Sequence, residues 1–173
     1  MVVTTYVKRS TRKEESPYLY RIKLSREDIT EAKVHLSKEK EVPYVAGPLT
    51  GASKVAELMF NLFEMEYLAD EYVYMLGFDA KCGLLGVTEI SHGCSCEAFC
   101  RPRELFQAAL LMNAEGIVLV HNHPSGSCEI SKSDEKNMKE VISAGELLRV
   151  KVLDYIVLGQ NEYYSAAEQN QIS

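Results

Sequence analysis

A short apolar run that ends directly in two histidines is the strongest constraint in this sequence. Ile117 to Val120 (IVLV) follows a glycine and contains only β-branched residues and leucine, which predicts a short strand buried on both faces. The residues after it, HNHPSGSCEIS, are typical of a turn-rich loop, and a helix is expected from about Lys132 to Leu148. The sequence therefore places a polar loop between a buried strand and a helix.

The rest of the chain alternates predicted helices and strands. Apolar residues recur at helical spacing after Ser53, and Pro102 suits the first turn of a second helix. The expected helices are 53–68 and 103–113, and the expected strands are 72–78, 84–91 (a hairpin with the preceding strand), 151–158 and a short one at 163–164, before a capped turn at Ser165. This order indicates an α/β fold with a mixed central β-sheet flanked by helices.

The first 48 residues differ from the rest in charge. Residues 1–40 contain ten Lys and Arg and six Asp and Glu, a net charge of +4, whereas residues 41–173 have a net charge of −10. We expect strands at about 2–8 and 18–24, and a short helix from Ser25, as its N-cap, to about Ser37. Two prolines and two glycines between Glu41 and Gly51 indicate a linker. The sequence thus predicts a basic N-terminal segment, 1–48, and a domain at 50–173.

Composition limits the partners of the chain. A net charge of −6 over 173 residues does not favour non-specific nucleic-acid binding, which needs clustered Lys and Arg. No apolar run approaches the roughly 18 residues that a membrane span needs, and the first residues lack the features of a signal peptide. Five cysteines, an odd number, suggest free thiols. We therefore expect a cytoplasmic protein without membrane contact; the sequence predicts no oligomeric state.

The loop after the buried strand combines residues that bind metals. His121 and His123 lie two apart on an extended backbone, so both imidazoles point to the same side. Asp134, in the first turn of the next helix, can supply a third ligand. Two histidines and one carboxylate, with a fourth position left to water, are typical of a catalytic zinc site. The alternative is structural: two ordinary loop histidines, loop residues such as Asn122, and a helix capping box made by Ser131 and Asp134.

The pattern HNHPSG followed by Ser131 and Asp134 resembles the RadC-like branch of the JAMM (MPN+) metalloprotease superfamily. Three flanking segments agree in order: RPRELF from Arg101, NAEG from Asn113 and LDYIVLG from Leu153. The resemblance covers about residue 50 to the end. It implies a JAMM/MPN (cytidine-deaminase-like) fold and Zn²⁺ held by His121, His123 and Asp134.

The superfamily also uses a glutamate near the first core strand, and the segment DEYVYMLGFD makes Glu71 the best match. Glu89 is the second choice and Glu66 the third, while the structural alternative for Glu71 is a solvated residue between helix and strand. The resemblance implies hydrolysis of a peptide or isopeptide bond by a zinc-activated water. Glu71 would act as general base and Ser131 would donate a hydrogen bond to the oxyanion, with a protein or peptide as substrate.

The sequence departs from the family pattern at three points. Cys128 and Ile130 occupy loop positions where most members have proline or a small polar residue, and Cys128 could be inert, oxidised or a metal ligand. Tyr155 replaces a common histidine that is not a metal ligand. Residues 1–48 are too short for the helix-hairpin-helix region that full-length RadC-like proteins usually have.

Other functions stay open at this point. A DNA-associated protein or a metal-dependent nuclease is one alternative, since the family has been labelled with DNA repair, although the charge does not indicate nucleic acid. A non-catalytic metal-binding scaffold is another. A zinc deaminase is disfavoured because the chain has no Pro-Cys pair. A structural zinc site is conceivable from four cysteines, Cys82, Cys94, Cys96 and Cys100, but small free thiols explain them more simply.

Overall fold

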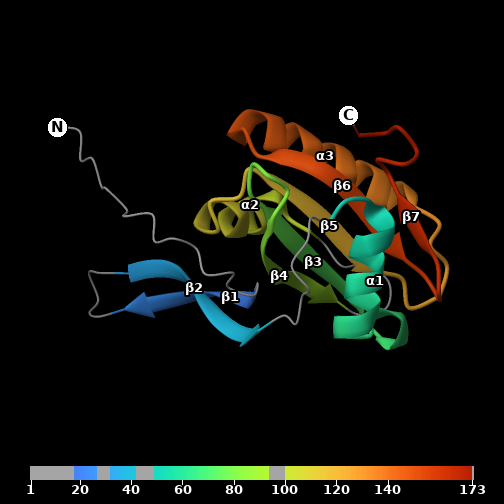
Figure 1. Cartoon of the computed structure of the whole chain (residues 1–173), viewed down its shortest axis with the longest axis horizontal. Helices are drawn as coiled ribbons and strands as arrows, with labels where there is room; N and C mark the ends of the chain where they lie inside the picture. Colours follow the sequence, from blue (N-terminus) through green and yellow to red (C-terminus); the bar gives the residue numbers. More distant parts are fainter. Residues whose placement is uncertain (1–17, 27–31, 42–48, 94–99, 173) are drawn as a thin grey trace.

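The computed structural model describes residues 18–26, 32–41, 49–93 and 100–172. Within them, seven strands form one mixed sheet in the order β2-β1-β4-β3-β5-β6-β7, accompanied by three α-helices and a short 3₁₀ helix (Figure 1). The predicted α/β class is confirmed. The elements are β1 Tyr18–Arg26, β2 Ala32–Glu41, α1 Ala52–Phe63, η1 Met65–Tyr67, β3 Glu71–Phe78, β4 Leu84–Gly93, α2 Pro102–Leu111, β5 Gly116–Asn122, α3 Lys132–Leu148, β6 Lys151–Leu158 and β7 Tyr163–Ser165.

Helices cover both faces of the sheet. Apolar side chains of α1, such as Val55 and Met59, pack on one face with Leu76 and Val120. Helices α2 and α3 pack on the opposite face, where Leu105 lies in the same core as Leu119 and other residues of β5 and β6. Figure 1 shows this three-layer arrangement. Successive side chains of β5 therefore pack alternately into two separate apolar cores, one on each face of the sheet.

Strand β5 is an interior strand between β3 and β6, and all seven of its residues are buried. It pairs antiparallel with β3, where Val73 lies opposite His121, and parallel with β6, where Val157 lies opposite His121. The β3–β4 hairpin is antiparallel, as the sequence predicts. The carboxyl end of β5 thus lies beside the first residues of β3, and this juxtaposition positions the site described below.

Helix α1 ends earlier than its sequence predicts. Expected to continue to Leu68, it stops at Phe63, and Glu64 takes a left-handed conformation with φ 48°. The apolar spacing continues because Met65, in η1, is fully buried. The sequence predicts too long a helix because no glycine or proline marks its end.

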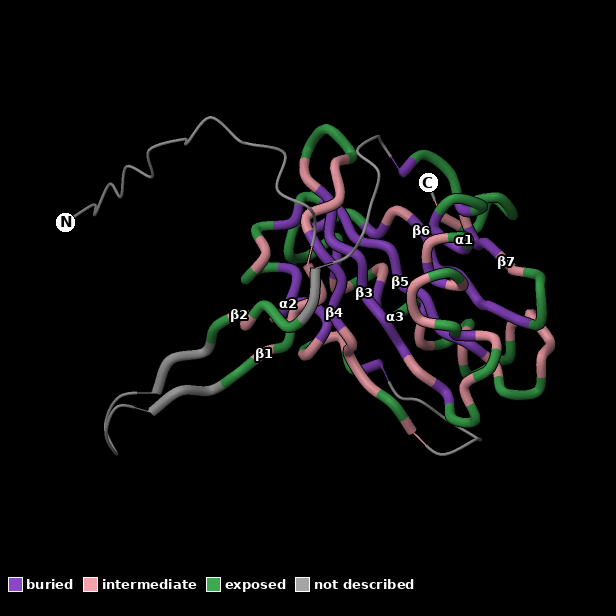
Figure 2. The backbone as a smooth tube through the Cα atoms, turned by 60° about the horizontal axis from the view of Figure 1, so that its bottom comes forward, coloured by how far each residue is buried: buried purple, intermediate pink, exposed green. Residues whose placement is uncertain are grey.

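The helix predicted from Ser25 to Ser37 is wrong, because this segment contributes to two strands. Strand β1 pairs antiparallel with β2, and its first three residues, 18–20, pair parallel with β4. Within the hairpin, Lys23 forms an ion pair of 2.8 Å with Glu39, and the Lys38 ammonium lies 3.9 Å from the Tyr18 ring centroid. Figure 2 shows the described part of the hairpin projecting from the body of the sheet.

The strand predicted at 2–8 and most of the predicted linker, 42–48, lie outside the described residues. In the part of the chain that is described, no helix has both the length and the apolar character required to cross a membrane.

Candidate metal centre

Four potential metal ligands meet where β5 ends. Ligand atoms of Glu71, His121, His123 and Asp134 all lie within 4.8 Å of one another. The two histidine Nε2 atoms are 3.1 Å apart, and each is 3.4 Å from an oxygen of Asp134. The structure thus brings together three side chains that the sequence predicts as metal ligands and the glutamate that it predicts as general base.

The core fixes the position of His121. Its side chain is 2% exposed, and its ring meets Tyr155 edge-on with centroids 5.4 Å apart. His123 is the first residue beyond β5, and its backbone N–H donates to the Leu158 carbonyl of β6 over 3.0 Å. Because an extended backbone continues from His121 to His123, both imidazoles face the layer of α3.

A hydrogen bond to the loop sets the tautomer of His123. Its Nδ1 lies 3.1 Å from the Ser127 carbonyl oxygen, which can only accept a hydrogen bond. The proton of a neutral His123 therefore belongs on Nδ1, which leaves a lone pair on Nε2, the atom that faces His121 and Asp134. A histidine oriented in this way is a typical metal ligand.

Asp134 is shared between the histidines and the start of α3. Its carboxylate accepts hydrogen bonds from the Ser131 backbone N–H over 2.8 Å and from the Ser131 hydroxyl over 2.5 Å, and the Asp134 N–H donates to Ser131 Oγ. This is a complete capping box, as the structural alternative predicts. The capping role and the position beside the histidines are compatible, because Asp134 reaches both with its two oxygens.

The pKa values of the site favour an ionised Asp134. Burial alone would raise the pKa of this carboxyl, but hydrogen bonds from His121 and His123 outweigh it and hold the pKa well below its usual range. The hydrogen bond to Asp134 in turn raises the pKa of His123. Metal ligands must be deprotonated, so a cation placed among these side chains would compete with protons for His123 and Asp134.

Glu71 is the first residue of β3 and approaches the cluster from the neighbouring strand. Its Oε1 lies 4.0 Å from His121 Nε2, farther than either oxygen of Asp134 lies from its histidine. Neither of the other two candidate glutamates belongs to the cluster: Glu89 binds His92 over 2.8 Å, and Glu66 lies in η1.

The geometry of the three inner ligands fits zinc. Two atoms that each lie about 2.0–2.1 Å from a tetrahedral zinc ion are about 3.3–3.4 Å apart. The observed separations are 3.1 Å between the two histidine nitrogens and 3.4 Å from each nitrogen to a different oxygen of Asp134, which is close to this spacing. The two nitrogens and the Asp134 carboxylate are called the triangle of donors below. Two imidazoles and a carboxylate also suit zinc chemically. Glu71 is the fourth member of the group and lies farther out, with its Oε1 4.0 Å from His121 Nε2.

Comparison with known proteins gives the family of this arrangement. The model of the RadC-like JAB domain matches residues 49–171, which contain all four residues of the cluster. The chain belongs to the RadC-like JAB domain family. The recognition made from the loop motif is thereby confirmed.

Relatives of this RadC-like chain carry the name UPF0758 protein. One from Alkaliphilus metalliredigens is 38% identical over 109 residues, which are 63% of this chain and 47% of the relative. Another, from Actinobacillus succinogenes, is 37% identical over 131 residues, 73% of this chain and 60% of the relative. A third, from Thermotoga maritima, is 34% identical over 63% of this chain and 49% of its own length. The matched region thus spans about half of these relatives.

The departures from the family pattern lie around the cluster but outside it. Cys128 has no place in the group of four, and burial raises the pKa of its thiol. Tyr155 lies under His121, and its hydroxyl donates to Asn137 Oδ1 over 3.5 Å. No described cysteine belongs to a metal-binding group: Cys82 is exposed and Cys100 is buried, while Cys94 and Cys96 lie outside the described residues.

Ser131→Ala is expected to destabilise the fold by about 1 kcal/mol, the usual loss for an N-cap hydroxyl. The hydroxyl both accepts from the Asp134 N–H and donates to the Asp134 carboxylate, so two bonds are lost together. Urea unfolding of the metal-free protein measures this loss. Ser131→Thr, which can form the same bonds, is the matched control. Equal unfolding midpoints for the Ala and Thr variants would mean that the Ser131 hydroxyl does not stabilise the start of α3.

Gly159→Ala is expected to destabilise the fold by about 1–3 kcal/mol, because it overpacks two loops. A Cβ at Gly159 would lie 2.5 Å from the Gly126 carbonyl oxygen and 2.8 Å from the Cys128 nitrogen. Both contacts are with backbone, which cannot rotate away, in the loop whose Ser127 carbonyl orients His123.

The control for Gly159→Ala is Asn161→Gly in the same turn. Asn161 has φ 59°, a conformation that glycine adopts freely, so stability should change by less than about 0.5 kcal/mol. Urea unfolding midpoints give both values. A Gly159→Ala midpoint equal to that of the wild type would mean that the two loops do not press on each other.

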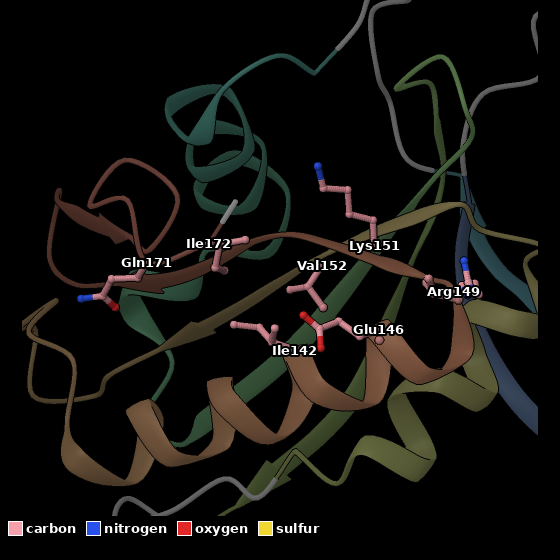
Figure 3. A pocket seen from close by; sticks show the side chains of 9 residues that line it. Ile142, Glu146, Arg149, Lys151, Val152, Gln171 and Ile172 are labelled. Atoms are coloured by element: carbon pink, nitrogen blue, oxygen red, sulfur yellow. The ribbon is translucent and has the colours of Figure 1, made fainter.

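A groove of about 340 Å³ lies elsewhere, between the last turns of α3, the start of β6 and the chain near Ile172 (Figure 3). Its apolar residues include Ile142 and Val152, and Glu146 and Lys151 also line it. Since β5 and β6 run parallel, the start of β6 lies at the opposite end of the sheet from the cluster. The groove is therefore separate from the candidate metal centre.

Proposed function

We propose that this RadC-like domain is a zinc-dependent hydrolase that cleaves a peptide or isopeptide bond. The observation that carries the proposal is the close approach of two histidine nitrogens and the Asp134 carboxylate, 3.1–3.4 Å apart, with the Glu71 carboxylate 4.0 Å from His121 Nε2. A structural zinc site usually has four protein ligands, whereas three ligands and an adjacent base are typical of hydrolytic sites. Membership of the JAB domain family supports the same choice.

Each residue has a distinct role in the proposal. His121, His123 and Asp134 would hold the ion, and zinc would supply a positive charge that acidifies water and polarises the scissile carbonyl. Glu71 would take a proton from the attacking water and pass it to the leaving amine. Its side chain is only 11% exposed, so bulk water competes little for that proton.

Ser131 has a conditional role. Its hydroxyl proton points to the Asp134 carboxylate in this structure. Ser131 would donate to a tetrahedral oxyanion only after that hydrogen bond is exchanged, so its contribution to the rate belongs to the substrate complex. We propose a peptide segment of a protein as the substrate class, because an amide is the bond that this constellation is suited to attack.

The proposal is tested by assaying one protein preparation against two substrate classes. Zinc-loaded protein, chelated protein and the Glu71→Gln variant are each incubated with a peptide library read by mass spectrometry and with supercoiled plasmid. We expect new peptide ends only with the zinc-loaded wild type and no nicking in any sample.

The outcomes of this assay separate the competing functions. Plasmid nicking that requires both zinc and Glu71 would replace the peptidase by a nuclease. Stoichiometric zinc without cleavage of either substrate would favour the scaffold, provided that isopeptide-linked substrates are also intact after incubation.

A further inference from the structure

The side chain of Asn122 holds the backbone on both sides of Glu71. Its Oδ1 accepts a hydrogen bond from the Tyr72 N–H over 2.8 Å, and its Nδ2 donates to the Asp70 carbonyl over 3.1 Å. Asn122 is 1% exposed. One carboxamide thus binds the residues immediately before and after the glutamate.

This contact occurs where the main-chain ladder between β3 and β5 ends. The last register pair is Val73 with His121, and the next backbone N–H of the loop, that of His123, bonds to Leu158 of β6 instead. The first residues of β3 therefore extend past the end of the ladder on the β5 side. The Asn122 carboxamide here uses one N–H donor and its carbonyl acceptor, as a peptide group does, and it extends the ladder there.

The location of Asn122 links the two halves of the cluster. It stands between His121 and His123 in the sequence, so its main chain moves with both imidazoles, while its side chain is fastened to the main chain around Glu71. On the other side, Glu71 is paired with Gly93 of β4. The carboxamide thus adds a hydrogen-bonded connection from the histidine segment to the start of β3, beyond the last ladder pair of Val73 with His121.

We propose that Asn122 is a positioning residue that sets the place of Glu71 relative to the histidines, and so governs how Glu71 acts at the proposed metal centre. The inference rests on the proposed function for its chemical meaning, but the connection itself can be tested without catalysis. A residue that only caps a strand would stabilise the fold equally whatever residue stands at position 71. A positioning residue acts through Glu71.

The first test is amide hydrogen exchange in the metal-free protein. Asn122→Leu keeps a similar side-chain volume and removes both hydrogen bonds. We expect the Tyr72 amide to exchange at least about tenfold faster in this variant, with the mid-strand Leu76 amide unchanged. Unchanged protection at Tyr72 would overturn the inference, as would an equal increase along all of β3, which would indicate general loss of stability.

The second test is a double-mutant cycle on zinc affinity, measured by competition with a chelator. Residues that support a metal site from outside the ligand set typically change metal affinity by about 10–100-fold. We expect Asn122→Ala and Glu71→Gln each to lower zinc affinity by about tenfold or less. The double variant should bind zinc as tightly as the single variant with the lower affinity. If the double variant loses zinc affinity by the product of the two single-variant fold-changes, the two residues act independently and the inference is overturned.

Asn137→Ala is the matched control for this cycle. Asn137 is another amide with two partners, since it donates to the Cys100 carbonyl over 2.7 Å and accepts from the Tyr155 hydroxyl over 3.5 Å. Among the described residues, no hydrogen bond connects Asn137 to those around Glu71, so the fold-changes in zinc affinity caused by Asn137→Ala and Glu71→Gln should multiply. If Glu71→Gln leaves zinc affinity unchanged, Asn122→Ala must also leave it unchanged, and any weakening would contradict the inference.

These tests separate failure of the inference from failure of the proposed function. A wild-type protein that binds no zinc would refute the hydrolase, while the exchange rate of the Tyr72 amide would still decide whether the connection exists. Zinc binding with independent effects of Asn122 and Glu71 would refute the positioning role alone.

Discussion

The double variant His121→Ala/His123→Ala is expected to lose stoichiometric zinc. Both imidazole Nε2 atoms belong to the triangle of donors, and their removal leaves only the Asp134 carboxylate of the three inner ligands. Zinc sites of four protein ligands contribute about 10–16 kcal/mol of apparent binding free energy, or roughly 3 kcal/mol for each ligand. Loss of two ligands therefore corresponds to an affinity about 10⁴-fold weaker.

Metal analysis after chelation, reloading with zinc and desalting measures this loss. His92→Ala is the matched control, because the His92 side chain is 61% exposed, binds Glu89 and lies outside the cluster. It should keep one zinc per chain. Circular dichroism establishes that the double variant is folded, and a folded double variant that retains one zinc per chain would refute the ligand assignment.

Glu71→Gln is expected to retain one zinc per chain and to lose hydrolysis by about 10²–10⁴-fold, the usual contribution of a general base. Glutamine keeps the shape of the side chain and cannot accept a proton from water. The carboxylate stands 4.0 Å from His121 Nε2, outside the triangle of donors, which is why zinc affinity should stay within about tenfold of the wild type.

Rates of peptide cleavage at saturating zinc, compared with zinc content, measure both parts of this prediction. Glu89→Gln provides the control, since Glu89 binds His92 and is not part of the cluster. It should retain the wild-type rate. A Glu71→Gln protein with full activity would remove the general base from the mechanism, whereas one without zinc would make Glu71 a ligand.

The elements around the central sheet could be predicted because their signals are local. The apolar run before His121 and the proline at the start of α2 each indicate one element. The sequence wrongly predicts a helix from Ser25 to Ser37 because Ser25, Glu27 and Asp28 are typical of a helix start. The alternation at Val34 and Leu36, which is typical of a strand, was the weaker signal, and pairing with β1 decides the outcome.

The candidate site also contains residues that the local sequence indicates and residues that it does not. The two histidines and Asp134 are close in sequence, so their spacing alone indicates a metal site. Glu71 is fifty residues from His121, and only the family resemblance selected it from three glutamates. Asn122 gave no signal, because asparagine is common in loops and its hydrogen bonds to the start of β3 appear only in three dimensions.

The junction of β1 with β4 has a practical consequence for work on this protein. The family match begins at residue 49, yet the first described strand, β1, begins at Tyr18, and residues 18–20 pair with 86–88 of β4. The Tyr20 ring covers Gly86 so closely that a Cβ there would lie 2.4 Å from it. A protein shortened to residues 49–173 would leave this stretch of β4 as an open edge, prone to pair with other chains. Solubility and activity of the domain are therefore best measured on the chain that includes the hairpin.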